Sequence, residues 1–185
     1  MRWRAVFAAV LLALAAGCGQ NSRESDEGAP EVPPAPVARE VKVFFLREAP
    51  CEVHPVGRTV TAALPVEFAR AALESLVAGP TEEEAAAGFR SRLPDPEQVW
   101  RYWQSRVGFG QAPPYEGEEL RILDVSELPG GILRVNFSPE LAAYGSGEDR
   151  VCEVIRQVEA TVQQFPEYGN VSIAVDGRHE NIWRP

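Results

Sequence analysis

Histidine and cysteine are scarce in this chain of 185 residues, which has two histidines and three cysteines. It contains no Cys-x-x-Cys pair or other spacing typical of a metal site, so the sequence predicts no metal ligands and no cofactor. It also lacks a Gly-x-Ser-x-Gly elbow and a Gly-Lys-Ser/Thr phosphate loop, and the segment GSG at 145–147 fits neither pattern. We therefore expect no catalytic residue, and the chain is predicted not to be an enzyme.

Positively charged residues are also few: the chain has 18 lysines and arginines but 27 aspartates and glutamates, which gives a formal net charge of −9. Such an acidic chain has no general attraction for phosphate backbones, so nucleic acid is not an expected partner. No segment reaches the roughly 20 consecutive apolar residues that a membrane-spanning helix needs.

The apolar run that does occur, at residues 5–16, follows Arg2 and Arg4 and ends in small residues. This order is typical of an export signal, which we place at residues 1–17. The segment AAGC at 15–18 resembles the lipobox of bacterial lipoproteins, in which the cysteine becomes the acylated first residue, although Ala15 stands where leucine is usual. An ordinary signal peptide cleaved nearby is the alternative.

Lipidation of Cys18 would hold the protein on a bacterial membrane, on the extracytoplasmic side. Each buried CH₂ adds about 0.8 kcal/mol to membrane binding, and stable attachment takes two or more acyl chains. Loss of the signal would change the net charge from −9 to −11, because Arg2 and Arg4 are removed with it. Residues 18–40 are polar and then rich in proline and alanine, which predicts a linker before the domain at 41–185. The linker either holds the domain away from the membrane or merely connects it to the anchor.

The two remaining cysteines, Cys51 and Cys152, make an even count in an exported domain, which favours a disulfide. The bond would close a loop of about 100 residues, worth roughly 4–5 kcal/mol in the chain-entropy account. Two free buried cysteines are the alternative.

Apolar spacing predicts a mixed succession of strands and helices. Strands are expected at 41–46, at 52–60 (short and interrupted by Pro55), at 119–125, at 131–137 and at 170–177, and helices at 65–78, from 82, and over a buried stripe at 151–165. The glutamates at 82–84 are expected to form a solvated face. The order β(β)-α-β-β-α-β predicts an α+β fold, a single compact domain with a mixed or antiparallel sheet covered by two main helices.

An aromatic-rich insertion at about 97–117 is the least regular part of the domain. Its aromatic residues form either a small satellite core or an exposed binding surface that stacks on sugar rings. The candidate surface residues are Trp100, Tyr102, Trp103 and Tyr115.

Several motifs together resemble the GerMN domain, the sporulation and spore germination domain. They are VKVFFL at 41–46, LVAGP at 76–80, SRLP at 91–94, LRVNFSPEL at 133–141 and the long segment at 155–177. The resemblance implies a compact α+β domain related to ring-building modules of envelope assemblies, with no known catalysis. It therefore implies an interaction or assembly module, connected with spore formation or germination in the family, whose partner is an envelope protein or further copies of itself. A lipoprotein that binds cell-wall glycan or peptide through the aromatic insertion is the alternative.

Overall fold

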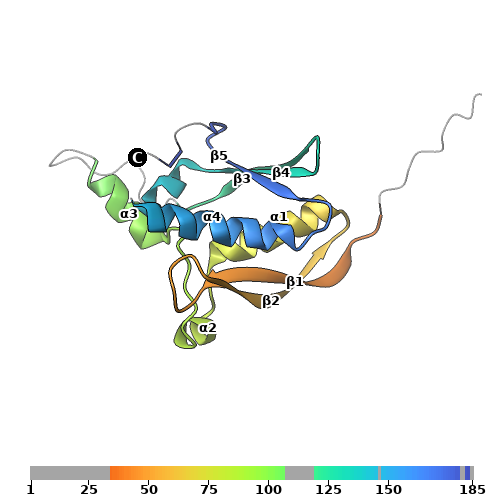
Figure 1. Cartoon of the computed structure of the whole chain (residues 1–185), viewed down its shortest axis with the longest axis horizontal. Coiled ribbons are helices and arrows are strands. Elements are labelled where there is room, and N and C mark those ends of the chain that lie inside the picture. The colour runs from red at the N-terminus through yellow and green to blue at the C-terminus, as the bar shows by residue number, and fades with distance from the viewer. Residues whose placement is uncertain (1–33, 107–118, 146, 180–181, 184–185) are drawn as a thin grey trace, which may run out of the picture. The chain divides into compact units, whose positions relative to one another are not determined.

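The computed structural model describes residues 34–106, 119–145, 147–179 and 182–183 (Figure 1). These residues belong to the unit Pro33–Pro185. The predicted signal peptide, Cys18 and Tyr115 lie outside the described residues. The elements run in the order β1 (Val37–Leu46), β2 (Val53–Ala62), α1 (Pro65–Ala78), α2 (Glu82–Ala86), α3 (Pro96–Gln104), β3 (Ile122–Leu128), β4 (Ile132–Phe137), the 3₁₀ helix η1 (Pro139–Tyr144), α4 (Glu148–Gln163) and β5 (Asn170–Val175).

The strands form two sheets with the two long helices between them (Figure 1). β1 and β2 make an antiparallel hairpin, whereas β3 pairs antiparallel and β5 parallel with the central strand β4. α1 contacts β1, β2 and β3, while α4 contacts β1, β2 and β5. The predicted α+β class is confirmed, but its single sheet is replaced by two. Apolar alternation shows which residues of a strand face the core and does not show which strand lies beside it.

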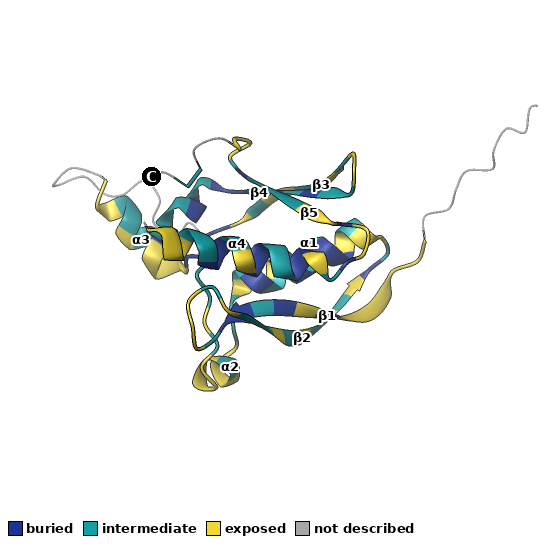
Figure 2. Ribbon diagram, viewed as in Figure 1, coloured by how far each residue is buried: buried dark blue, intermediate teal, exposed yellow. Residues whose placement is uncertain are grey.

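The hydrophobic core fills the space between the helices and the two sheets (Figure 2). Its largest fully buried side chains include Phe45, Phe137 and Phe165. α1 contributes Leu73 and Leu76, as its predicted apolar face required. Burial of each such side chain stabilises the fold by about 1.5–3 kcal/mol, which is why the strongly periodic segments dictate the architecture. Within the predicted stripe at 151–165, Val154, Val158 and Val162 of α4 are buried, and so is Phe165 just beyond the end of the helix.

The hairpin of β1 and β2 is longer and more regular than predicted. β1 begins at Val37, so the last four residues assigned to the linker are part of the strand. β2 is continuous over Val53–Ala62, and the expected interruption at Pro55 is wrong. Pro55 lies opposite Phe44, whose N–H and C=O point away from β2 and bond to α4 side chains. The missing N–H of proline therefore breaks no ladder bond, as expected on an edge strand.

The helix ends follow the local chemistry of the sequence. Pro65 occupies the first turn of α1, and the helix stops at Gly79, whose φ of 82° favours glycine. α2 begins with a capping box, in which Thr81 accepts the N–H of Glu84 while the Glu84 carboxylate accepts the N–H of Thr81. α2 confirms the short helix predicted from residue 82.

Candidate functional site

The disulfide region joins the hairpin loop to the start of α4. In the structure Cys51, in the loop between β1 and β2, is bonded to Cys152 in the first turns of α4. Their Cα atoms are 5.7 Å apart, within the usual range for a disulfide, and 101 positions separate them in sequence. The bond therefore fixes one end of the outer hairpin to the central helical layer.

The free edge of β1 is closed by a row of side chains from α4. Gln164 accepts the N–H of Lys42 at 2.7 Å and donates to its C=O. One turn earlier, Thr161 Oγ1 accepts the N–H of Phe44 at 3.2 Å, and one turn before that, Gln157 Nε2 donates to the C=O of Phe44 at 3.4 Å. These amide and hydroxyl groups replace the bonds that a further strand would make.

The same edge ends in a backbone bridge. Leu46 and Arg90 exchange N–H···O bonds of 2.9 and 3.0 Å. From residue 42 to 46 the outward-facing backbone groups of β1 are thus satisfied within the domain. Addition of a further strand is therefore excluded along this part of the edge.

A buried carboxylate lies beside this row. Glu153, whose side chain is 5% exposed, accepts a 2.6 Å bond from Arg92 Nε and lies 3.9 Å from an Arg90 nitrogen. The backbone N–H of Arg92 is held by Gln157 Oε1 at 2.8 Å. The segment that precedes α3 is therefore fixed to α4 by a close ion pair, a longer one and one amide.

A second ion pair corrects the expectation for the glutamates at 82–84. Both Glu84 oxygens accept bonds of 2.6 Å from Arg58, and the two side chains are 17% and 20% exposed. The hydrogen bonds from Arg58 lower the pKa of Glu84, and those same bonds raise the pKa of Arg58. Glu82 and Glu83 are exposed, as predicted, whereas Glu84 ties α2 to β2.

The aromatic segment begins as α3, which contacts η1 and buries Val99 completely. Trp100, Tyr102 and Trp103 are all half-buried. The rings of Tyr102 and Trp103 meet edge to face at 5.0 Å, and the guanidinium of Arg106 lies 4.5 Å from the Tyr102 ring centre. These three candidate residues are therefore partly covered and retain only part of their surface for a ligand.

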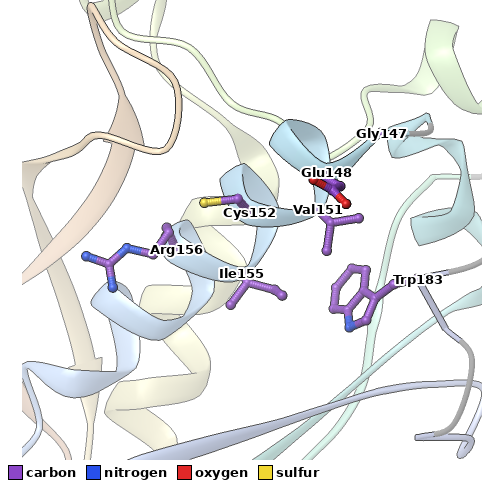
Figure 3. Close-up of a pocket in the computed structure, with 7 residues that line it drawn as sticks. All are labelled: Gly147, Glu148, Val151, Cys152, Ile155, Arg156 and Trp183. Carbon is purple, nitrogen blue, oxygen red and sulfur yellow. The ribbon is translucent and has the colours of Figure 1, made fainter.

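A pocket of about 550 Å³ lies along the outer side of α4 (Figure 3). Val151, Ile155 and Trp183 form its apolar walls, and Glu148 and Arg156 lie at its ends. Trp183 was not among the residues singled out from the sequence, because an isolated tryptophan near a chain end carries no pattern. The volume of the pocket falls in the range of about 300–1,000 Å³ that is usual for small-ligand sites.

Buried contacts hold Trp183 in place. Its ring meets that of Tyr144 edge to face at 5.8 Å, and its C=O accepts a 3.3 Å bond from the Tyr144 hydroxyl. Burial raises the pKa of Tyr144. The indole is therefore a positioned wall of the pocket.

No cluster of His, Cys, Asp and Glu able to hold a metal ion is found in the part of the chain that the structure describes. Ser172 Oγ and His179 Nδ1 lie 3.3 Å apart on an exposed surface, and no described carboxylate contacts His179. None of the described helices is both long and apolar enough to cross a membrane.

The fold and the sequence agree on one class of domain. Residues 114–181 match the model of the Germane family, described as sporulation and spore germination. The first GerMN domain of the sporulation protein GerM from Bacillus subtilis has a similar structure, with a TM-score of 0.50 at 18% identity over 79% of this chain and 89% of that chain. The resemblance to the GerMN family is thus confirmed by the match to the family model and by the similar fold. The family match covers residues 114–181, and the likeness of the remaining elements is one of fold.

Two further solved structures show weaker similarity. The tandem GerMN domains of the same Bacillus subtilis protein align with a TM-score of 0.46 at 15% identity, over 82% of this chain and 43% of that chain. A putative lipoprotein from Clostridium perfringens aligns with a TM-score of 0.39 at 12% identity, over 78% and 77%. No curated protein matches the sequence.

Proposed function

We propose that the protein is a lipid-anchored interaction or assembly module of the bacterial cell envelope. Cys18 carries the acyl chains, the linker spans the distance from the membrane, and the GerMN domain binds an envelope protein or further copies of the chain. In a spore-forming cell this role belongs to spore formation or germination, in keeping with the family description. The role is one of binding, without catalysis.

One observation carries this proposal. An export pattern that ends in Cys18 precedes a GerMN domain whose own two cysteines are joined. Disulfides persist mainly in oxidising, extracytoplasmic compartments, so the bond within the domain supports the same location as the pattern before it.

The anchor is tested by the mass of the mature N-terminal peptide and by cell fractionation. The wild-type protein should start at Cys18, carry acyl chains and sediment with membranes, whereas Cys18→Ser should not be acylated. Cys51→Ser/Cys152→Ser is the matched control and should keep the membrane location. An unmodified Cys18, or a wild-type protein in the soluble fraction, would contradict the anchor.

The interaction is tested by native electrophoresis of membranes solubilised in mild detergent. A module of this kind should migrate as a complex larger than its monomer, and the complex should dissociate on denaturation. Migration as a monomer under every mild condition would argue against assembly.

The pocket at Trp183 favours one alternative, a lipoprotein that recognises cell-wall glycan or peptide. A tryptophan beside two aliphatic side chains presents a flat apolar face of the kind that stacks on sugars. Under this alternative Trp183→Ala should abolish binding of purified muropeptides, measured by calorimetry. Leu123→Ala is the matched control, because Leu123 is exposed and does not line the pocket. Absence of muropeptide binding to the wild-type protein would dismiss the alternative.

A further inference from the structure

A groove of about 460 Å³ lies between the start of α1, the β3–β4 hairpin and the connection from α4 to β5. Its lining combines aliphatic side chains with two carboxylates and contains no lysine or arginine. The residues that matter are Leu64, Val66, Leu128, Ile132, Glu127 and Glu167.

The walls of this groove are held by bonds within the domain. Glu67 accepts the N–H groups of Ala63 and Leu64 at 2.8 and 3.1 Å, which fixes the turn before α1 and lowers the pKa of Glu67. On the opposite side the Tyr168 hydroxyl donates to Glu127, and burial together with this bond raises the pKa of Tyr168. The groove is thus formed before any partner arrives.

The hairpin wall also depends on a glycine. Gly131 has a φ of 70°, and a Cβ there would lie 3.0 Å from the carbonyl oxygen of Glu167. Gly131 C=O accepts the N–H of Gly169 at 2.9 Å. This close approach of two backbones brings Glu167 to the edge of the groove.

The apolar part of the groove is accessible. Leu64 is 42% exposed, one of three large hydrophobic residues in the described ranges with such exposure. A single exposed leucine is common, but here it adjoins an apolar floor with charges of one sign at its rim. Covering that floor would remove apolar surface from water, which favours association.

We propose that this groove binds a segment of an envelope protein that carries a large apolar side chain next to a lysine or arginine. The apolar side chain lies against Leu64 and Leu128, and the cation faces Glu127 and Glu167. The inference rests on the proposed function and names the surface and the partner chemistry for it.

Charge favours such a partner over a second copy of the chain. A second copy would bring an excess of carboxylates, because the chain carries a net charge of −9. A basic segment would instead be drawn by the field of the acidic domain and then held by the rim carboxylates.

The test places a photo-crosslinking amino acid at position 64 of the full-length protein in living cells. The same amino acid at position 123 is the matched control, because Leu123 is 44% exposed and lies outside the groove. Position 64 should give an adduct with one envelope protein, mapped to an apolar side chain beside a lysine or arginine. Glu167→Lys should reduce this adduct by about fivefold, whereas Glu83→Lys should leave it unchanged.

A melting curve accompanies each variant, and Glu167→Gln replaces Glu167→Lys if the latter does not fold. The groove assignment is overturned by equal adducts at positions 64 and 123, by no adduct at 64, or by an adduct that charge reversal does not weaken. An adduct with a second copy, with lipid or with glycan would overturn it as well. A partner captured by carbodiimide coupling but not from position 64 would leave the proposed function standing and refute the groove alone.

Discussion

Thr161→Val tests whether α4 side chains satisfy the backbone groups at the edge of β1, and it changes the side-chain shape very little. Thr161 is fully buried, and its hydroxyl oxygen accepts the N–H of Phe44 at 3.2 Å. Valine nearly preserves the volume but cannot accept that bond. The Phe44 N–H then has no acceptor on the α4 side, where the helix keeps water away.

The expected cost follows from that single lost acceptor. A buried donor left unpaired costs about 1–3 kcal/mol. For a domain of this size each kcal/mol lowers the melting temperature by roughly 2–4 °C. We therefore expect a decrease of about 2–12 °C and a lower urea midpoint at an unchanged slope.

Amide hydrogen exchange locates the effect. Exchange at Phe44 should accelerate far more than at Val43 and Phe45, whose backbone groups face β2 in the alternating pattern of an antiparallel pair. Thr59→Val is the matched control on the exposed side of β2 and should change stability by less than about 0.5 kcal/mol. If Thr161→Val leaves both the stability and the exchange of Phe44 unchanged, the helix side chains do not close the edge.

Three further results are expected from the same structure. Replacing Cys51 and Cys152 by serine should cost about 4–5 kcal/mol in urea unfolding, because the bond closes a loop of 101 positions, and an equal loss should appear when the wild-type protein is reduced. Arg92→Ala should lower the free energy of unfolding by close to the roughly 3–5 kcal/mol of a broken buried ion pair, because it leaves the buried Glu153 carboxylate with only the distant Arg90. Arg90→Ala should lower it by less than about 1 kcal/mol, and equal effects of the two variants would contradict this ranking. Glu84 has a lowered pKa in the folded state, so its ion pair stabilises the protein above the unfolded pKa of 4.5 and is lost as the pH falls through the folded value. Between about pH 5 and pH 3 the wild-type protein should therefore lose more stability than Glu84→Gln, and parallel pH profiles would show that the pair contributes nothing.

The elements with strong periodicity could be predicted from the sequence. α1, β4 and β5 appear where the apolar spacing placed them, because each buries one face or stripe. α4 was also predicted, but only in part. Its valines face the core as expected, yet Gln157 and Thr161 are buried as well.

The burial of those polar residues could not be predicted because it depends on a long-range contact. Gln157 and Thr161 bond to Phe44, more than a hundred positions earlier in the chain. A helix-period pattern treats such residues as solvent-facing. The same contact explains why β2 was expected to be interrupted. Pro55 breaks no hydrogen bond of the hairpin only because Phe44, which lies opposite, bonds to α4 side chains.

The candidate site was predicted unevenly for similar reasons. Trp100, Tyr102 and Trp103 form a cluster in the sequence, and in the structure all three are partly buried. Trp183 and Leu64 attract no attention in the sequence, and only tertiary structure places them at a pocket and a groove. Glu84 was assigned to a solvated face because its partner, Arg58, comes from a distant strand.

Crosslinking in living cells, followed by purification and mass spectrometry, shows whether the protein acts by binding other proteins of the envelope. The chain has a single lysine, Lys42, but 27 aspartates and glutamates, so a carbodiimide that couples carboxylates to amines is the suitable reagent. We expect the full-length protein to be recovered joined to an envelope protein or to further copies of itself, and Cys18→Ser to weaken this capture. Recovery with muropeptides alone, or with no protein at all, would show that the protein is not an envelope interaction module.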